Sequence, residues 1–342
     1  MKIAFFDTKP YDRQGFSEMN KQYNNEIKFL EGKLNAETAF LTNGFDTVCA
    51  FVNDEIDSKT IDILSSNGVK LLAMRCAGYN NVDIQSLRGK MRAVRVPGYS
   101  PYAVAEHTAA LLFSVNRKIH KAYNRTRENN FNINGLMGMD LHGKTAGIIG
   151  TGRIGICFVN ICKGIGMKVM AYDPYPRENA GIEYVTIDEL YERSDIISLH
   201  CPLTPKTRYI LNSQSFERMK DGVIIINTSR GQLIHTDSLI EYLKSGKVKG
   251  AGLDVYEEES EYFFEDYSDN IIKDDILARL LTFPNVIVTA HQAFFTKEAY
   301  DEIVRTTFES IKAFEENRPL EFEICFDYKS NDVVEGIQCN SK

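Results

Sequence analysis

Ionisable side chains follow three apolar segments in the last third of the chain. Arg230 follows "IIINTS", Asp254 and three glutamates (257–259) lie in "GLDVYEEE", and His291 follows "VIVTA". Histidine, with an ordinary pKa of about 6.5, can donate or accept a proton near neutrality, and a neighbouring carboxylate stabilises its protonated form. An arginine can hold a carboxylate through two parallel hydrogen bonds. These residue types therefore suit acid–base chemistry on a substrate that carries a carboxylate.

Each of these side chains also has a simpler structural explanation when it is taken alone. A histidine at a strand end is more often a structural residue, a loop arginine can bond carbonyl groups, and acidic loops are usually solvated. Spacing does not choose among Glu257, Glu258 and Glu259. Their common position at successive strand ends favours the functional interpretation, because parallel sheets bind ligands at the carboxyl ends of their strands.

A glycine-rich loop precedes these residues. In "IIGTGRIG", Gly150 permits a tight turn, Gly152 allows a pyrophosphate to approach the backbone, and Gly155 lets a helix pack on a strand. The N-terminus of that helix offers free N–H groups to phosphates. Asp173 ends the next apolar segment, where a carboxylate can accept both ribose hydroxyls and repel the extra phosphate of NADP. We therefore expect NAD, although Arg177 is a side chain suited to a 2′-phosphate.

A nicotinamide cofactor transfers a hydride to or from a carbon that bears an oxygen. A histidine for proton transfer and an arginine for a carboxylate complete the requirements of one reaction. The combination predicts the interconversion of a 2-oxo acid and a 2-hydroxy acid.

Alternating strands and helices must position these residues. From residue 145, short apolar segments alternate with amphipathic ones, which predicts a parallel sheet with helices on both faces. Strands are expected at 145–150, 168–173, 195–201, 222–229, 248–255 and 285–290. Residues 1–98 show a shorter alternation, with helices expected near 14–34 and 57–66, and further helical segments are expected at 101–128 and 296–316.

The overall composition limits the class of protein. A length of 342 residues suggests about two domains, and the net charge of −7 argues against a nucleic-acid partner. No apolar run reaches the roughly 20 residues of a membrane helix, so we expect a cytoplasmic protein without a membrane partner. Seven cysteines form no Cys-x-x-Cys pair, and no histidine spacing suits a metal site, so no metal is expected. Four cysteines are predicted to be reduced: Cys49, Cys157, Cys162 and Cys201.

Motifs along nearly the whole chain resemble those of the D-isomer-specific 2-hydroxyacid dehydrogenases. They are "RCAGYNNVD", "VPGYSPYAVAEHT", "GIIGTGRIG", "SLHCPLTPKT", "INTSRGQL", "GLDVYEEE" and "TAHQAFFT". A long segment containing "YFFEDYSDN" resembles the lactate-forming branch of the family. The resemblance implies an oxidoreductase that reduces pyruvate to D-lactate with NADH.

The resemblance also assigns roles to residues. The catalytic set would be Arg230, Glu259 and His291. Substrate-binding residues would be Ala77, Gly78, Tyr99 and Arg230, with Phe51 and Phe294 as apolar walls. Cofactor contacts would come from Gly150, Gly152, Arg153, Ile154, Gly155, Asp173, Cys201, Pro202, Thr207, Thr228, Ser229, Arg230 and Asp254.

The implied architecture is two Rossmann-like or flavodoxin-like α/β domains, each a doubly wound parallel sheet, with a cleft between them. Residues 1–99 and 296–330 would form the substrate domain, residues 100–295 the NAD-binding domain, and residues 331–342 a polar tail. A homodimer is expected, and pairing of dimers into a tetramer stays open. Two alternatives remain: a dehydrogenase for larger 2-oxo acids, and a nucleotide-sensing binding protein of the same fold.

Overall fold

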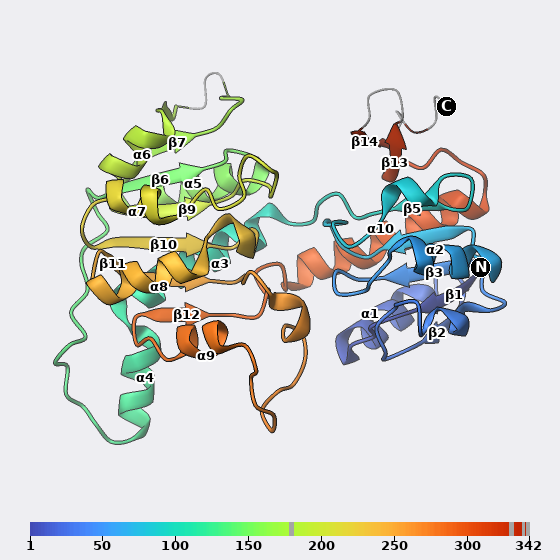
Figure 1. The fold of residues 1–342 in the computed structure, drawn as a ribbon, viewed down its shortest axis with the longest axis horizontal. Coiled ribbons are helices and arrows are strands. Elements are labelled where there is room, and N and C mark those ends of the chain that lie inside the picture. The colour runs from blue at the N-terminus through green and yellow to red at the C-terminus, as the bar shows by residue number, and fades with distance from the viewer. Residues whose placement is uncertain (178–180, 328–331, 337–338, 340–342) are drawn as a thin grey trace. The chain divides into compact units, whose positions relative to one another are not determined.

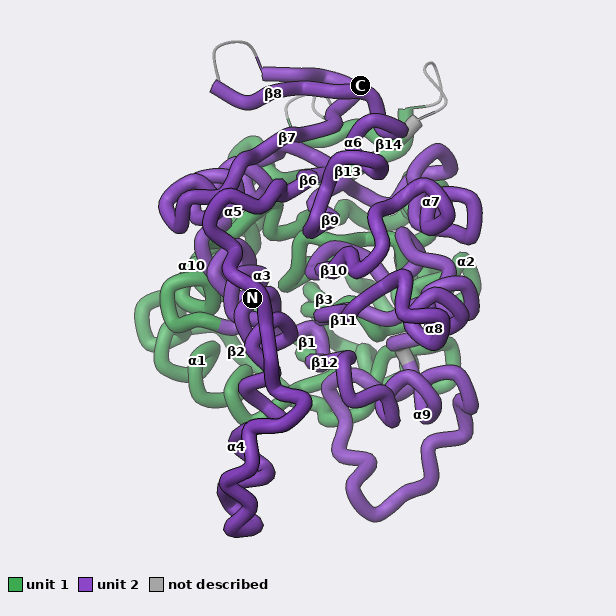
Figure 2. The backbone as a smooth tube through the Cα atoms, turned by 90° about the vertical axis from the view of Figure 1, so that its left-hand side faces the viewer, with its two compact units in different colours: residues 1–100, 296–342 green, residues 101–295 purple. Residues whose placement is uncertain are grey.

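The computed structural model describes residues 1–177, 181–327, 332–336 and 339. The chain forms two compact units, residues 1–100 with 296–342 and residues 101–295 (Figure 2). Each unit contains one seven-stranded sheet with helices packed on it (Figure 1). The expected pair of doubly wound α/β domains is therefore confirmed.

The sheet of unit 2, residues 101–295, is parallel throughout. Its strands are β6 (Thr145–Ile149), β7 (Lys168–Tyr172), β8 (Glu183–Tyr184), β9 (Ile196–Leu199), β10 (Val223–Asn227), β11 (Val248–Leu253) and β12 (Val286–Val288). They lie in the order β12-β11-β10-β9-β6-β7-β8. The strand order reverses at β6 and β9, which is the point where doubly wound sheets bind nucleotides.

Helices cover both faces of this sheet. They are α3 (Pro101–Arg117), α4 (Ile119–Arg127), α5 (Arg153–Gly164), α6 (Ile187–Arg193), α7 (Ser213–Arg218), α8 (Thr236–Ser245) and α9 (Asp275–Leu281). Alternate residues of β10 enter different apolar cores: Ile225 packs with residues of α6 to α9, whereas Ile224 and Ile226 pack with residues of α3 and α5. This explains why the strand is apolar throughout, since neither face meets solvent.

Unit 1 has a mixed sheet in the order β14-β13-β5-β4-β3-β1-β2. Its strands are β1 (Lys2–Phe5), β2 (Glu26–Phe29), β3 (Thr47–Ala50), β4 (Leu71–Met74), β5 (Arg92–Val94), β13 (Glu323–Asp327) and β14 (Asp332–Glu335). Its helices are α1 (Pro10–Asn20), α2 (Ser58–Ser66) and α10 (Lys297–Glu315), with 3₁₀ turns η1 (Ala39–Thr42) and η2 (Ile84–Leu87). The first five strands are parallel, whereas β13 runs antiparallel to β5 and β14 antiparallel to β13.

Three local expectations are wrong. The helix expected near 14–34 ends at Asn20, and residues 26–29 form β2, whose alternating burial is that of an edge strand. The helical segment at 101–128 is broken at Lys118, which adopts a φ of 50° between α3 and α4. Residues 332–335, expected within the polar tail 331–342, pair with β13 as β14, while residues 331, 337, 338 and 340–342 of that tail lie outside the described residues.

Candidate active site

His291 and Glu259 form a hydrogen-bonded pair at the carboxyl edge of the unit 2 sheet. The Nδ1 atom of His291 lies 2.7 Å from Oε1 of Glu259, and about a fifth of each side chain is exposed (20% and 22%). The second oxygen of Glu259 accepts the backbone N–H of Tyr256 at 2.9 Å. The carboxylate is thus fixed by the backbone, and it in turn fixes the imidazole ring.

Asp254 organises the loop that carries His291. This fully buried residue follows β11, and its carboxylate accepts hydrogen bonds from Thr289 Oγ1 at 2.5 Å, Gln292 N–H at 3.0 Å and Ala293 N–H at 2.8 Å. These donors flank His291 on both sides. Asp254 therefore holds the backbone from which the imidazole projects.

Arg230 follows β10, the neighbour of β11, at the same sheet edge. Its Nη1 donates to the carbonyl oxygen of Ser229 at 2.7 Å, and its own carbonyl accepts from Asn227 Nδ2 at 2.8 Å. At Gly231 any Cβ atom would lie 2.0 Å from the backbone of Tyr256. The loops after β10 and β11 therefore pack closely because a glycine follows the arginine.

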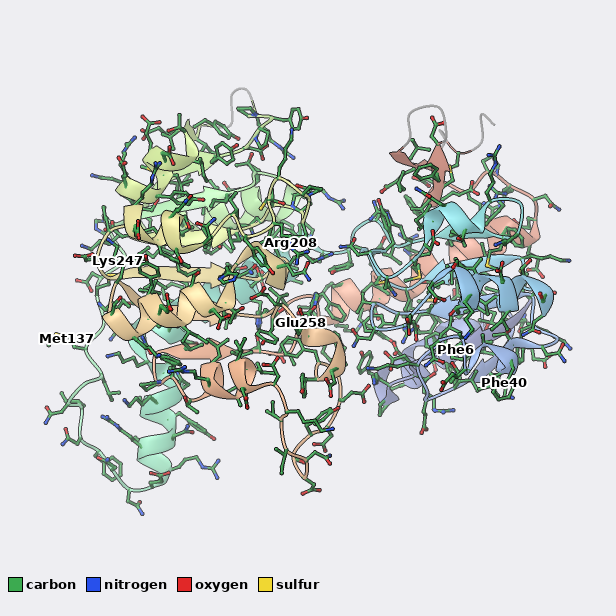
Figure 3. All side chains as sticks on the ribbon, viewed as in Figure 1. Phe6, Phe40, Met137, Arg208, Lys247 and Glu258 are labelled. Carbon is green, nitrogen blue, oxygen red and sulfur yellow. A yellow bond between two sulfur atoms is a disulfide. The ribbon has the colours of Figure 1, made fainter. Side chains whose placement is uncertain are left out.

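The three consecutive glutamates have different environments. Glu257 accepts the backbone N–H of Thr236, at the start of α8, at 2.7 Å, whereas Glu258 is exposed (Figure 3). Only Glu259 among the three pairs with His291. Local geometry thus distinguishes three residues that spacing alone does not.

The glycine loop between β6 and α5 has the geometry expected of a phosphate-binding turn. Gly150 has a φ of 97° and lies against the backbone of His200, while a Cβ atom on Gly155 would meet the Gly150 carbonyl oxygen at 2.1 Å. A Cβ on Gly152 would meet nothing within 4 Å, so the backbone there is accessible. Arg153 and Ile154 begin α5, which leaves the N–H groups of its first turn facing the loop.

Asp173 lies directly after β7 beside this loop. Partial burial raises the pKa of its carboxyl, but hydrogen bonds from Thr151 and the Tyr175 N–H, with the charge of Arg177, hold that pKa below the ordinary value. The Thr151 N–H and hydroxyl lie 2.7 and 2.9 Å from Asp173 Oδ2. An ionised carboxylate at this position fits the ribose hydroxyls of NAD and opposes the additional phosphate of NADP.

The remaining predicted cofactor contacts lie after β9 and β10. The hydroxyl of Ser229 donates to the carbonyl oxygen of Cys201 at 2.7 Å, and the hydroxyl of Thr207 donates to that of Pro202 at 2.7 Å. Thr228 is buried and shares a hydrogen bond with a hydroxyl of α3. Every predicted cofactor contact therefore lies along the carboxyl edge that also carries Arg230 and His291.

The predicted substrate residues divide between the two units. In unit 1, Phe51 follows β3, and Ala77 and Gly78 follow the adjacent β4; Tyr99 lies beyond β5 and is half-buried. Phe294 belongs to unit 2 and is buried. The structure thus places the unit 1 candidates along the carboxyl edge of that unit's own parallel strands.

The sequence analysis did not single out His107. This residue lies on α3, and its side chain points toward the buried carboxylate of Asp254. Its Nε2 atom lies 3.1 Å from Thr289 Oγ1 and 3.3 Å from Asp254 Oδ1. The motif "VPGYSPYAVAEHT" contains this histidine, but only the fold brings it to the loop before His291. The four cysteines predicted to be reduced are free thiols, as is Cys76, whereas Cys325 and Cys339 form an unpredicted disulfide.

Two negative findings apply to the described residues. Among residues 1–177, 181–327, 332–336 and 339, no group of three or more histidines, cysteines, aspartates and glutamates is arranged to hold a metal ion. Within the same ranges, no helix has the length and apolar character needed to cross a membrane.

Comparison with known proteins agrees with this geometry. Residues 109–293 match the family described as "D-isomer specific 2-hydroxyacid dehydrogenase, NAD binding domain". The chain is 45% identical to D-lactate dehydrogenase of Escherichia coli (strain K12), over 95% of this chain and 100% of that protein. It is 48% identical to a 2-hydroxyacid dehydrogenase homolog of Haemophilus influenzae, over 91% of this chain and 95% of that one.

Solved structures extend the similarity to the fold. The apo-structure of Escherichia coli D-lactate dehydrogenase superposes with a TM-score of 0.87 at 43% identity, covering 94% of this chain and 99% of that chain. The Lactobacillus jensenii D-lactate dehydrogenase solved with NAD+ superposes with a TM-score of 0.79 at 30% identity, covering 94% of this chain and 99% of that chain. The cofactor is NAD, and the chain belongs to the family of D-isomer-specific 2-hydroxyacid dehydrogenases.

Proposed function

We propose that this protein is an NAD-dependent D-lactate dehydrogenase, which reversibly reduces pyruvate to D-lactate. The observation that carries the proposal is the His291–Glu259 hydrogen bond at 2.7 Å, on the sheet edge that also holds the phosphate loop. The relatives named D-lactate dehydrogenase match over nearly the full length of the chain, which supports pyruvate as the substrate.

The roles of the catalytic side chains follow from their contacts. Because Nδ1 of His291 is bound by Glu259, Nε2 is the nitrogen that donates a proton to the substrate oxygen. Glu259 orients the imidazole ring and lies beside the charge that the ring carries while it holds the proton for carbonyl reduction. Arg230 binds the substrate carboxylate through its planar guanidinium. Bound NADH supplies the hydride.

The substrate residues of unit 1 complete the proposal. Within unit 1, the backbone N–H groups near Ala77 and Gly78 bind the substrate carboxylate, and Tyr99 and Phe51 contact the substrate. Within unit 2, Phe294 is the apolar residue proposed to limit the size of the substrate side chain. The support is the motif match and the position of Phe51 and the 77–78 loop at adjacent strand ends.

A second candidate, a dehydrogenase for larger 2-oxo acids, is supported by one structural neighbour. The structure of D-2-hydroxyisocaproate dehydrogenase superposes with a TM-score of 0.84 at 30% identity, covering 94% of this chain and 99% of that chain. Because both candidates use the same catalytic side chains, substrate size alone separates them.

A kinetic panel tests these assignments. NADH oxidation is followed at equal enzyme concentration with pyruvate, 2-oxoisocaproate and phenylpyruvate, and the enantiomer of the product is determined by chiral chromatography. We expect the highest kcat/KM with pyruvate and a D-configured product. A higher value with the bulkier acids supports the second candidate, and tight NADH binding without any turnover supports a nucleotide-sensing protein instead.

We also propose that the protein is a cytoplasmic homodimer. Large apolar side chains are exposed on α4 and the segment that follows it, including Tyr123 at 58% and Met137 at 86%. Figure 3 shows Met137 on that segment. Such a surface is typical of an interface. Five free thiols support a reducing compartment. Sedimentation velocity tests the assembly, with Tyr123→Lys and Met137→Lys expected to shift it toward monomer.

A further inference from the structure

The C-terminal strand β14 contacts the loop that we assign to the substrate carboxylate. We propose that Arg95 and Glu335 are positioning residues for the peptide bond between Ala77 and Gly78, and that the Cys325–Cys339 disulfide keeps Glu335 in place. The inference rests on the proposed function, in which this loop binds substrate, and adds a device that controls the loop.

Arg95 connects the loop to β14. One guanidinium nitrogen, Nη1, donates to the carbonyl oxygen of Ala77 at 2.9 Å, and the other, Nη2, donates to Oε2 of Glu335 at 2.5 Å. The hydroxyl of Tyr79 donates to Oε1 of Glu335 at 3.1 Å, and the guanidinium lies 5.4 Å from the centre of the Tyr79 ring. The Glu335 carboxylate therefore holds the loop on both sides of Gly78, through Arg95 on one side and Tyr79 on the other.

The contact with Ala77 sets the direction of an N–H donor. In a trans peptide the carbonyl oxygen and the following N–H lie in one plane and point in opposite directions. A cation bound to the Ala77 oxygen therefore fixes where the Gly78 N–H points. It also polarises the peptide, which strengthens the hydrogen bond that this N–H donates. The Cys76 thiol, 3.2 Å from the Gly78 oxygen, restrains the next peptide in the same way.

Arg95 depends on Glu335 for its own position. Only 15% of the Arg95 side chain is exposed, and its Nε atom is buried without a hydrogen-bond partner within the described part of the chain. A shielded guanidinium of this kind is stabilised by a carboxylate far better than by carbonyl oxygens alone. Loss of Glu335 would therefore displace the arginine from Ala77 as well.

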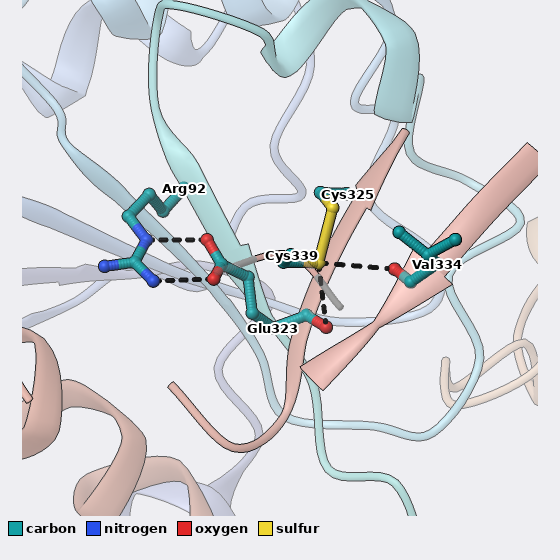
Figure 4. Close-up of a disulfide and its surroundings, with 5 residues drawn as sticks. All are labelled: Arg92, Glu323, Cys325, Val334 and Cys339. Atoms are coloured by element: carbon teal, nitrogen blue, oxygen red, sulfur yellow. Dashed lines mark hydrogen bonds and ion pairs between the residues drawn. A yellow bond between two sulfur atoms is a disulfide. The ribbon is translucent and has the colours of Figure 1, made fainter. Parts of the chain in front are cut away.

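The disulfide restrains the strand that carries Glu335. Within the described part of the chain, β14 is the edge strand of its sheet and pairs with β13, with Glu335 opposite Ile324 and Val334 opposite Cys325. Beyond Glu335, the chain is joined covalently to β13 by the bond between Cys325 and Cys339 (Figure 4). An edge strand of four residues has a neighbouring strand on one side, so a covalent bond to β13 limits its separation from the sheet.

The redox state of the Cys325–Cys339 pair would then control the position of the loop that contains Ala77 and Gly78. Reduction by a dithiol transfers two electrons and two protons to the bond, giving two cysteine thiols while the dithiol becomes a cyclic disulfide. Disulfides that persist in a reducing compartment are usually redox-sensing. The oxidised enzyme should therefore bind pyruvate more tightly than the reduced enzyme.

Steady-state kinetics of full-length variants test the positioning role. Glu335→Gln should raise the KM for pyruvate roughly two- to fivefold, as expected for a partly exposed ion pair, and Arg95→Met about tenfold or more. The kcat of Glu335→Gln and the Kd for NADH, measured by fluorescence, should be unchanged, because neither side chain belongs to the cofactor-binding unit.

A neighbouring ion pair provides the matched control. Arg92 and Glu323 are joined by two hydrogen bonds of 2.6 Å that connect β5 to β13 (Figure 4). Glu323→Gln should lower the Tm and leave the KM for pyruvate unchanged. An unchanged KM in Glu335→Gln, or an equal rise in Glu323→Gln, overturns the positioning role. A wild-type protein that reduces no 2-oxo acid overturns the proposed function instead.

The redox step has a separate measurement. The KM for pyruvate is compared before and after incubation with dithiothreitol, and thiols are counted after denaturation, with five expected in the oxidised protein and seven in the reduced one. Reduction should raise the KM of the wild type, and Cys339→Ser should show the raised KM without responding to dithiothreitol. Equal KM values for the five-thiol and seven-thiol forms overturn redox control.

Discussion

The backbone N–H of His291 donates to the carbonyl oxygen of Asp254 at 2.7 Å, and the carboxylate of the same aspartate binds the N–H groups of the next two residues. His291 adopts a φ of 51°, a region unusual for residues other than glycine. Such a conformation persists where the surroundings impose it, which is common in active sites. Here Asp254 supplies the restraint, and the strand end is turned so that the imidazole reaches Glu259.

Replacing His291 by glutamine should remove proton transfer and preserve the fold. We expect kcat to fall by about two to four orders of magnitude, the usual contribution of a general acid. The affinity for NADH should stay at the wild-type value, measured by fluorescence titration. Wild-type turnover in this variant would exclude His291 as the acid.

Three consecutive glutamates allow a comparison at constant local sequence. Glu259→Gln should lower kcat by about tenfold or more, because a neutral amide stabilises the imidazolium less well. Glu258→Gln should change neither kcat nor Tm, since this side chain is exposed. Glu257→Gln should reduce only the Tm, because it removes a charged partner of the Thr236 N–H at the start of α8. An equal loss of kcat in all three would contradict the assignment of Glu259.

Two glycines of the phosphate loop should respond differently to alanine. Gly152 has a φ of −63° and open space around its Cβ position, so Gly152→Ala should fold normally and weaken NADH binding by obstructing the pyrophosphate. Gly155→Ala should lower the Tm, because the new methyl group would lie 2.1 Å from the Gly150 carbonyl oxygen. Differential scanning fluorimetry with and without NADH separates the effect on NADH binding from the effect on the Tm. Normal NADH affinity in Gly152→Ala would contradict the role of Gly152 in the phosphate loop.

His200 should make stability sensitive to acid. Burial lowers the pKa of this histidine from 6.5 to about 3. Between these values the unfolded chain binds a proton that the folded chain excludes, so the contribution of His200 is complete above about pH 6.5 and is lost as the pH falls toward 3. The loss approaches about 1.4 kcal/mol per pH unit.

Urea unfolding at pH 7, 6 and 5 measures this dependence. His200→Gln should show a flatter decline in the free energy of unfolding than the wild type. The exposed His142 provides the control, since His142→Gln should follow the wild-type curve. Parallel curves for the wild type and His200→Gln would contradict a neutral imidazole at this half-buried position.

The sequence predicted six of the seven strands of unit 2, namely β6, β7 and β9 to β12, which are apolar or end in recognisable loops. The two-residue strand β8 was not predicted, whereas the glycine loop lies where its spacing predicted it. Gly246, which follows the amphipathic segment of α8, ends that helix with a φ of 80°. These features depend on local sequence, which is why local reasoning finds them.

The missed elements depend on contacts distant in the chain. Residues 26–29 form a strand because they pair with β1, and residues 332–335 form one because they pair with β13. The pairing of Cys325 with Cys339 requires that hairpin, and seven cysteines without spacing motifs do not specify it. The choice of Glu259 likewise came from family resemblance, since only the loop geometry separates it from Glu257 and Glu258.

The division of unit 1 into two chain segments affects the order of biosynthetic folding. The apolar core around Phe5 and Phe16 includes Phe308 and Ile311 of α10, which leave the ribosome just over three hundred residues after β1. The first hundred residues therefore cannot complete their core while they are alone, whereas residues 101–295 form one continuous segment with both of its own cores. During translation the middle of this protein should mature before its beginning, and the N-terminal segment must wait for a helix synthesised near the end.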